Sequence, residues 1–258
     1  MSERPLISFL LFAYNQERFI REAVAGAFAQ TYSPLEIILS DDCSRDRTFD
    51  IMQDMAAAYH GPHRIMLNRN PKNLGIGNHV NALVKLSRGS LIVTAAGDDV
   101  SIPHRTQASY EFWLQGNGVI KSLFSNALVI DEKGSGQGPL FAKLIDFSED
   151  MSQFVAVGNC WVAGCTHCFS RELFERFPPL PAGIIHEDRA IPFRAILLGK
   201  IGYTPQQLIH YRRHSTNTFM AIDKRVAHKV FRSKCADLMS WLSDLELINI
   251  PEKAKVRR

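Results

Sequence analysis

The sequence has no hydrophobic run long enough to cross a membrane as a helix. Such a helix needs about 20 apolar residues, and the longest candidate, residues 154–165, is interrupted by Gly158 and Asn159. A secretory signal is also missing, because the apolar stretch at residues 6–14 is short and no cleavage site follows it. These absences predict a cytoplasmic protein, either soluble or attached peripherally to the inner face of the membrane.

Surplus positive charge is missing from most of the chain. Residues 221–258 hold nine Lys and Arg against five Asp and Glu, and this surplus of four equals the formal net charge of +4 for all 258 residues. Residues 1–220 are therefore balanced, which argues against the broad basic face that binds duplex nucleic acid. The basic end is predicted to be solvated, with contact to an anionic membrane as the alternative.

The five cysteines do not form a pattern typical of a disulfide framework or a zinc finger. An odd number without a secretory signal predicts reduced thiols. Cys165, His167 and Cys168 lie close together, but no second pair of ligands follows at zinc-finger spacing. The apolar neighbours of these residues predict a buried strand within residues 154–169 instead.

Two common nucleotide-binding motifs are absent as well. The first predicted strand is not followed by Gly-x-Gly-x-x-Gly, which argues against a dinucleotide-dependent oxidoreductase. The turn-rich loop at residues 70–78 lacks the Gly-Lys-Ser/Thr ending of a P-loop. A nucleotide ligand must therefore be held in another way.

The chain does contain an alternation of strand and helix patterns. Strands are predicted at residues 6–12, 35–39, 65–67 and 91–94, and helices at 17–30, with Asn15 as N-cap, 46–59 and 78–86. This order is typical of a parallel sheet with helices on both faces. The second half is less regular, with helices at 102–113, 171–177 and 187–198, a strand at 119–129, a turn or hairpin tip at 134–139 and short strands at 201–203 and 208–211.

The last predicted element is an amphipathic helix that begins near residue 226. Its apolar residues recur at spacings of four and three, which places them on one face. They are Phe231, Cys235, Leu238, Leu242 and Leu245. This face is predicted to pack against the body, and a homodimer or membrane contact is the alternative.

Acidic residues follow two of the predicted strands at their carboxyl ends. Asp41-Asp42 follow one strand, and Gly97-Asp98-Asp99 follow another. Ligands of open α/β sheets bind at this edge, so we expect a cleft for a phosphorylated, metal-bound ligand. A third pair, Glu187-Asp188, is far downstream and can complete the chemistry.

Six short motifs occur in the order of a known enzyme family. They are residues 11–15 (Leu-Phe-Ala-Tyr-Asn), 36–46 (Glu-Ile-Ile-Leu-Ser-Asp-Asp-Cys-Ser-Arg-Asp), 73–75 (Asn-Leu-Gly), 97–99 (Gly-Asp-Asp), 186–188 (His-Glu-Asp) and 211–217 (Tyr-Arg-Arg-His-Ser-Thr-Asn). Over nearly all of residues 5–220 the chain resembles the inverting, nucleotide-sugar-dependent glycosyltransferases of family 2. It departs from the family at Phe12-Ala13, where Pro-Thr is common, and at Ala96, where the metal motif often has its first Asp.

The resemblance implies a fold and a division of the chain. It implies the GT-A fold, a Rossmann-like and mostly parallel α/β sheet with helices on both faces. Residues 1–220 would form this domain, with a nucleotide-binding half at 1–100 and an acceptor-side half at 101–220. Residues 221–258 would add the amphipathic helix and basic tail.

The resemblance also implies the chemistry. A Mn²⁺ or Mg²⁺ ion would be held by Asp98, with His214 as a further ligand, and would neutralise the leaving diphosphate. Asp188 would be the general base for the acceptor hydroxyl. Sugar and acceptor contacts would come from Asp99, Trp161 and Glu187. Read alone, each acidic pair has a structural explanation too, as a turn or a helix start.

The remaining implied site residues bind the donor. The residues expected around the nucleotide are Ala13, Tyr14, Asn15, Glu17, Asp42, Ser44, Asn73, Gly75, Asn78, Gly97 and Asp98. Tyr14 would stack on the base, Asp42 would accept a hydrogen bond from the base or ribose, and Gly75 would permit close backbone approach. Arg212 and His214 would bind the diphosphate.

The predicted function is transfer of a sugar from a UDP- or dTDP-sugar to a hydroxyl of a glycan or lipid-linked acceptor. Two alternatives stay open. The first is another enzyme class on a similar sheet, such as a nucleotidyltransferase. The second is a non-catalytic module that binds nucleotide sugars or glycans, which the missing carboxylate at Ala96 favours.

Overall fold

The first half of the chain forms a parallel sheet with connecting helices. In this computed structural model, which describes residues 4–143, 163–215, 217 and 227–248, the strands lie in the order β3-β2-β1-β4, and all three pairings are parallel. The elements are β1 (Ile7–Ala13), α1 (Ile20–Phe28), β2 (Leu35–Asp41), α2 (Thr48–Ala57), β3 (Arg64–Arg69), α3 (Ile76–Leu86) and β4 (Leu91–Ala96). Each predicted strand and helix of this half is present.

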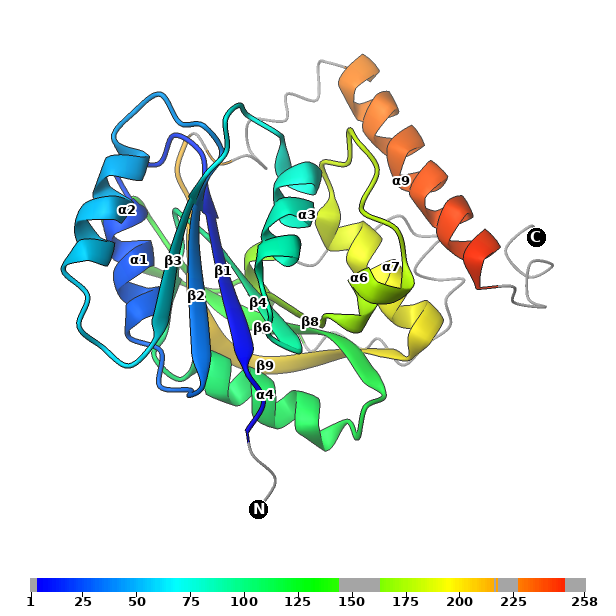
Figure 1. Cartoon of the computed structure of the whole chain (residues 1–258), viewed down its shortest axis with the longest axis horizontal. Coiled ribbons are helices and arrows are strands. Elements are labelled where there is room, and N and C mark those ends of the chain that lie inside the picture. The colour runs from blue at the N-terminus through cyan, green and yellow to red at the C-terminus, as the bar shows by residue number, and fades with distance from the viewer. Residues whose placement is uncertain (1–3, 144–162, 216, 218–226, 249–258) are drawn as a thin grey trace.

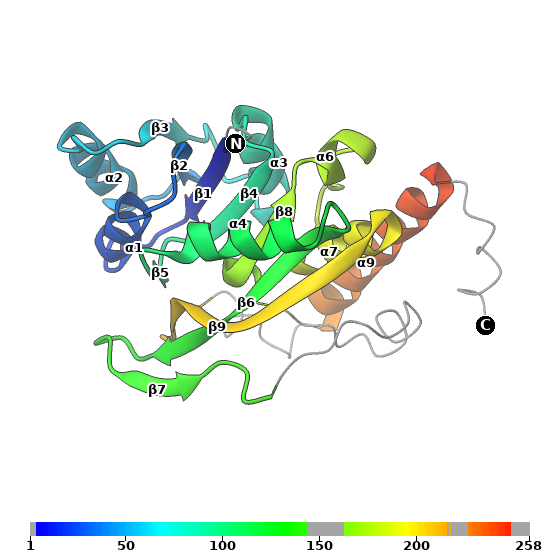
Figure 2. The same cartoon turned by 90° about the horizontal axis from the view of Figure 1, so that it is seen from below.

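The second half extends the same sheet with mixed pairing. Its elements are β5 (Val100–Ser101), α4 (Arg105–Gln115), β6 (Ile120–Ile130), β7 (Gly136–Pro139), the 3₁₀ turn η1 (Gly164–Thr166), β8 (His167–Ser170), α6 (Glu172–Arg176), α7 (Glu187–Leu198), β9 (Lys200–Arg212) and α9 (Ala227–Leu247). The sheet continues from β4 through β8, β6 and β9 to β5, and β7 pairs with β6. The pairs β4–β8 and β6–β8 are antiparallel, whereas β6 and β9 run parallel, as Figure 2 shows.

Two details of this half differ from the sequence prediction. The two short strands predicted at 201–203 and 208–211 are one continuous strand, β9. The pairing of β9 with β6 shifts register at several points. These irregularities interrupt the alternation of apolar and polar residues, so the sequence pattern of one strand resembles two strands with a loop between them. The turn predicted at 134–139 contains a further strand, β7, which pairs with the end of β6.

Helices cover both faces of the sheet (Figure 1). Side chains of β1 alternate between the two faces, as the two-residue period of a strand requires. Phe9 and Leu11 pack in the cluster that includes α1 and α2, and Leu10 packs in the cluster with α3, α6 and α7. The core is therefore two apolar layers on either side of one sheet, and the loops at the strand ends are left for binding.

The start of α1 corrects one prediction. Asn15 is not the N-cap, because the helix begins after Phe19, which makes no side-chain capping bond. Asn15 instead adopts φ 53°, and its side-chain Oδ1 accepts a hydrogen bond from the Arg45 backbone N–H at 2.9 Å. Asn tolerates this left-handed conformation better than most residues do. Its role is to tie together the loops after β1 and β2.

The helix predicted near the carboxyl end is present as α9, but its apolar face does not turn inward as a whole. Leu245 is buried, whereas Leu238 and Leu242 are 52% and 56% exposed. The buried face carries Asp237 and Asp244. The prediction that the apolar stripe packs on the body is therefore wrong for Leu238 and Leu242, whereas it is confirmed for Leu245, which packs with Phe193 of α7.

The physical reason lies on α7. Arg194 is fully buried, and its Nε donates to Asp244 Oδ2 at 2.9 Å. Leaving a buried cation without its carboxylate costs about 3–5 kcal/mol, so the pair requires the acidic face of α9 to turn inward. Phe193 and Trp241 stack beside it at 5.1 Å between ring centroids. No helix among the described ranges is long and apolar enough to span a membrane.

Candidate active site

The loops after β1 and β2 are fastened to each other by hydrogen bonds. The Asn15 backbone N–H donates to Ser44 Oγ at 2.8 Å, and Glu17 Oε2 accepts from the Arg47 backbone N–H at 2.9 Å. Cys43 adopts φ 64°, an uncommon conformation for a residue with a side chain. The structure therefore brings the predicted residues Asn15, Glu17 and Ser44 together, and gives them mutual contacts that shape the two loops.

Asp42 is the centre of the next cluster. Its carboxylate accepts hydrogen bonds from Asn70 Nδ2 at 2.8 Å and from the backbone N–H groups of Leu74 and Gly75 at 2.9 and 3.0 Å. Gly75 adopts φ 73°, which glycine reaches without steric cost. The loop before α3 is thus wrapped around Asp42.

Two more predicted residues close this loop. Asn73 Oδ1 accepts a second hydrogen bond from the Gly75 N–H at 3.1 Å, and Asn78 Nδ2 donates to the Leu74 carbonyl at 3.2 Å. Of the residues after β1, Ala13 is buried and Tyr14 is 42% exposed. The Tyr14 ring is therefore available to a ligand at this edge, whereas Ala13 can offer only its backbone.

A buried polar network supports Asp42 and was not predicted. Asn68 Nδ2 donates to Ser40 Oγ and to Asn70 Oδ1, and Ser40 Oγ lies 2.6 Å from His79 Nε2. Burial lowers the pKa of His79, although Asp42 and Asp41 oppose this shift. His79 is therefore neutral, and Ser40 can donate to its Nε2 while accepting from Asn68. The sequence signal was weak because His79 occupies an apolar helix face.

Asp98 and His214 form the second cluster. Asp98 follows β4 and His214 follows β9, and their Oδ2 and Nε2 atoms are 3.0 Å apart. Asn217 Nδ2 approaches the same oxygen at 3.4 Å. Gly97 is required beside them, because a Cβ there would lie 2.6 Å from the Ala13 Cβ and would also clash with Gln16 Oε1. Residues separated by more than 100 positions thus meet at the carboxyl end of β4.

Arg212 holds the Asp98-Asp99 turn in place. It is 1% exposed, its backbone N–H donates to Asp99 Oδ1 at 2.8 Å, and its Nε donates to the Asp98 carbonyl at 3.1 Å. Its Nη2 pairs with Glu22 at 2.7 Å. In this arrangement Arg212 positions the acidic turn, and its direct contact with phosphate stays a prediction.

Asp99 is also held inside the protein. The Cys165 thiol hydrogen-bonds to it, and burial together with the neighbouring charge of Asp98 raises the pKa of Asp99 well above its usual range. The buried surroundings of Asp99 therefore favour its neutral form. Among the described residues, no group of three or more His, Cys, Asp or Glu side chains is arranged to hold a metal ion.

Glu187 and Asp188 occupy the first turn of α7. Burial and then the Asp188 charge raise the pKa of Glu187 to about 8. Burial raises the pKa of Asp188 to about 6, against the lowering effect of His186 and Arg189. Asp188 Oδ1 is buried with no hydrogen-bond partner among the described residues. The two carboxyls therefore differ in pKa, and both titrate much closer to neutral pH than ordinary carboxyls.

The turn η1 connects the two acidic pairs. Thr94 Oγ1 in β4 donates to the Gly164 carbonyl at 2.9 Å, and Cys165 contacts Asp99. Glu187 lies against the same turn, because a Cβ on Gly164 would be 2.6 Å from Glu187 Oε1. One member of each acidic pair, Asp99 and Glu187, therefore lies against the same short turn.

The Asp42 cluster belongs to the same edge. β2, β1 and β4 are adjacent and parallel, so their carboxyl ends lie side by side. The Gly77 backbone N–H, in the first turn of α3, also donates to the Ile184 carbonyl, which precedes Glu187 in the chain. Trp161, the remaining predicted acceptor residue, lies outside the described residues.

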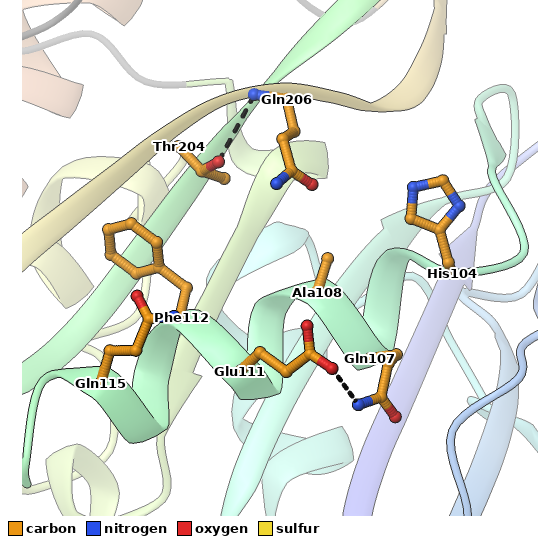
Figure 3. Close-up of a pocket in the computed structure, with 8 residues that line it drawn as sticks. All are labelled: His104, Gln107, Ala108, Glu111, Phe112, Gln115, Thr204 and Gln206. Carbon is orange, nitrogen blue, oxygen red and sulfur yellow. Dashed lines mark hydrogen bonds between the residues drawn. The ribbon is translucent and has the colours of Figure 1, made fainter.

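A separate cavity of about 260 Å³ lies between α4 and β9 (Figure 3). Phe112, Glu111 and Gln206 are among the residues that line it. None of the predicted site residues belongs to its lining. The acidic edge, rather than this cavity, therefore carries the candidate chemistry.

Solved structures show which class of protein has this fold. TarS residues 1–349 from S. aureus, in complex with UDP-GlcNAc, superpose with a TM-score of 0.65 at 15% identity, over 93% of this chain and 72% of that one. The mannosyltransferase PcManGT from Pyrobaculum calidifontis, with GDP-Man and Mn²⁺, gives 0.61 at 17% identity, over 95% and 74%. The fold is therefore that of the GT-A glycosyltransferases.

Sequence relatives define the family more narrowly. Residues 8–176 match the model of glycosyl transferase family 2. An uncharacterized glycosyltransferase of Haemophilus influenzae is 30% identical over 96% of this chain and 79% of its own length, and one of Nostoc sp. is 28% identical over 97% and 78%. The putative glycosyltransferase EpsE of Bacillus subtilis is 32% identical over 52% of this chain and 47% of its own. The chain belongs to glycosyl transferase family 2.

Proposed function

We propose that the protein transfers a sugar, with inversion, from a UDP- or dTDP-sugar to a hydroxyl group of a glycan or lipid-linked acceptor. The observation that carries this proposal is the meeting of Asp98-Asp99 and Glu187-Asp188 on η1. Single displacement needs a group that stabilises the leaving diphosphate and a separate base for the incoming hydroxyl. The two acidic pairs supply these groups from two different elements.

The nucleotide would lie across the ends of β1 and β2. The exposed Tyr14 ring can stack on the base. A carboxylate has about four lone-pair sites, and the protein fills three of those on Asp42, so one acceptor site is left for an N–H group of uracil or thymine. The three internal bonds orient this carboxylate, which favours base recognition by a rigid site.

The residues Asp98 and His214 fit a divalent cation in part. A carboxylate with an adjacent imidazole suits Mn²⁺ better than Mg²⁺, because Mg²⁺ prefers oxygen ligands alone, and diphosphate oxygens would complete the ligand set. A bound cation would neutralise the charge that develops on the leaving diphosphate. Arg212 would keep Asp98 in place through its bond to the Asp98 carbonyl.

Asp188 would accept the proton of the acceptor hydroxyl. As the acceptor oxygen bonds to the anomeric carbon from the face opposite the diphosphate, the bond to the diphosphate breaks and the proton moves to Asp188. A base works best when its pKa lies near the working pH, and the pKa of Asp188 is about 6. Glu187, with a pKa of about 8, would be protonated at neutral pH and could donate a hydrogen bond to sugar or acceptor.

Binding and product analysis test this proposal. Titration calorimetry with UDP, dTDP and GDP, with and without Mn²⁺, should show the tightest binding for a uracil or thymine nucleotide in the presence of Mn²⁺. NMR of the transferred sugar should show the anomeric configuration opposite to that of the donor. Retention of configuration would contradict the mechanism, and a preference for GDP would contradict the donor assignment.

A binding module without transfer is the second candidate, because Ala96 stands where the metal motif often has its first carboxylate. Release of UDP that depends on an acceptor would decide against it.

The division of the chain at residue 220 and a cytoplasmic location also belong to this proposal.

A further inference from the structure

The acidic face of α9 makes two contacts with α7 and its N-cap. Asp244 pairs with Arg194, and Asp237 lies beside the residues that flank the candidate base Asp188. Asp237 is 3% exposed and lies about two turns before Asp244 on the same buried face. Its Oδ2 is 3.3 Å from His186 Nδ1 and 3.7 Å from Arg189 Nη1. These two residues immediately precede and follow Glu187-Asp188, so a single carboxylate from α9 contacts both ends of the acidic pair.

We propose that Asp237 is a positioning residue for the transfer reaction: its carboxylate, in contact with both His186 and Arg189, fixes the first turn of α7 and offsets the positive charge of Arg189 beside Asp188. This inference rests on the proposed function, because it assigns Asp237 a role through the base. Asp237 does not need to contact sugar or nucleotide for this role.

The charges around the pair support the inference. After burial, the groups that act on Asp188 are His186 and Arg189, which lower its pKa, and Asp237, which raises it. Asp237 also raises the pKa of Glu187, after burial and Asp188. Asp237 therefore acts twice in the same direction: it repels the negative charge of the base, and it neutralises Arg189, which would otherwise attract that charge.

Burial makes this influence stronger than a surface charge would have. Oδ1 of Asp237 and Oδ1 of Asp188 are both buried without a hydrogen-bond partner among the described residues. At these two oxygens the charges are therefore screened less than they would be on the surface. A purely structural bond between α7 and α9 would not need a second buried acid so close to the base, because Arg194 and Asp244 already join these helices.

Three variants separate the electrostatic role from a structural one. Asp237→Asn removes the charge and keeps the shape. Arg189→Gln removes the opposing cation. Asp244→Asn is the matched control, because it removes a buried acid from the same face of α9 beside Arg194 rather than beside His186.

The readout is the pH dependence of turnover at saturating donor. Asp237→Asn should move the acid limb to lower pH by about 0.5–1 pH unit, as loss of one nearby charge does, and should lower the plateau because the base is weaker. Arg189→Gln should move the limb to higher pH. Asp244→Asn should lower the melting temperature and leave the limb in place.

Opposite shifts cannot come from general loosening of the helix. If Asp237→Asn and Arg189→Gln both leave the limb where it is, or both move it in the same direction, the inference is overturned. Should Asp237→Asn fail to fold, a second neutral variant, Asp237→Ser, carries the same expectation, and an unchanged acid limb in that variant would overturn the inference.

A second measurement distinguishes failure of this inference from failure of the proposed function. Carboxyl ¹³C resonances of labelled Asp and Glu, followed against pH, report the titration of Asp188 and Glu187 without any turnover, and Asp188→Asn assigns them. If these titrations move as expected while Asp188→Asn keeps full turnover, the coupling is real and the role of the base is wrong. If they do not move, Asp237 has no such role, whatever the reaction.

Discussion

The two acidic pairs that meet at η1 are built in different ways. Asp98-Asp99 lies at the end of a strand and is held by His214, Arg212 and Cys165. Glu187-Asp188 lies in the first turn of a helix, and Asp188 has a buried oxygen with no partner in the described part of the chain. One pair is fixed by hydrogen bonds, whereas the other keeps a buried carboxylate oxygen without such a partner among the described residues.

This difference suits two different tasks. A carboxylate proposed to bind a cation must keep its position, and the contacts of Asp98 with His214, Asn217 and Arg212 hold it in place. A base must gain a proton during the reaction and lose it afterwards, which requires a pKa near neutral pH and few competing donors. The same residue types therefore gain distinct roles from their surroundings, and the following predictions test this contrast.

The largest effect is expected at Asp188. The change Asp188→Asn should lower turnover by about 10²–10⁴-fold, because it removes a general base, and should leave affinity for UDP nearly unchanged. Turnover is measured by UDP release and affinity by calorimetry. Glu175→Gln, an exposed acid on α6, is the control. Full turnover in Asp188→Asn would show that the base is elsewhere.

The next effect is expected at Asp98, and it should appear in binding. Asp98→Asn should weaken Mn²⁺-dependent UDP binding by at least about tenfold, since even the loss of an outer partner of a metal site costs about 10–100-fold. Binding without Mn²⁺ should change much less. Calorimetry with and without the ion provides the comparison, and Glu111→Gln on α4 is the control. Equal losses in both conditions would assign Asp98 to the nucleotide alone.

A smaller effect is expected in stability at high pH. The pKa of Glu187 is raised to about 8 in the folded protein, so the folded state holds this proton more tightly than the unfolded state does. This contribution to stability is complete below the ordinary pKa of about 4.3 and is lost as the pH rises through 8. The melting temperature of the parent chain should therefore fall relative to that of Glu187→Gln by a few degrees between pH 6 and 9. A constant difference would contradict the raised pKa.

The contrast also explains what the sequence could predict. The strands β1, β2 and β4 have short apolar runs followed by polar residues, so both the parallel sheet and its acidic edge were predicted correctly. The helix α7 was predicted at its observed bounds, Glu187–Leu198, because acids mark its start and Gly199 its end. Local signals were sufficient for these elements.

Features that depend on distant partners were not predictable in this way. The inward acidic face of α9 follows from Arg194, which is 50 residues from Asp244. Burial of Arg105 is similar: its guanidinium donates to carbonyls of Thr94 and Cys165 and so braces η1. Only a structure shows which buried cation a given acid must meet.

The smallest predicted effect tests the contact between Glu187 and Gly164 of η1. A Cβ at Gly164 would lie 2.6 Å from Glu187 Oε1, a contact that the side chain can relieve only by turning away. Gly164→Ala should therefore lower turnover several-fold and leave the melting temperature nearly unchanged, because the clash involves the end of a flexible side chain. Gly136→Ala on β7 is the matched control, since its nearest neighbour is 3.7 Å away.

Unchanged turnover in Gly164→Ala would mean that the position of Glu187 against η1 does not matter for the reaction. Each acidic pair would then act independently of the other, which would break the link between them that η1 provides.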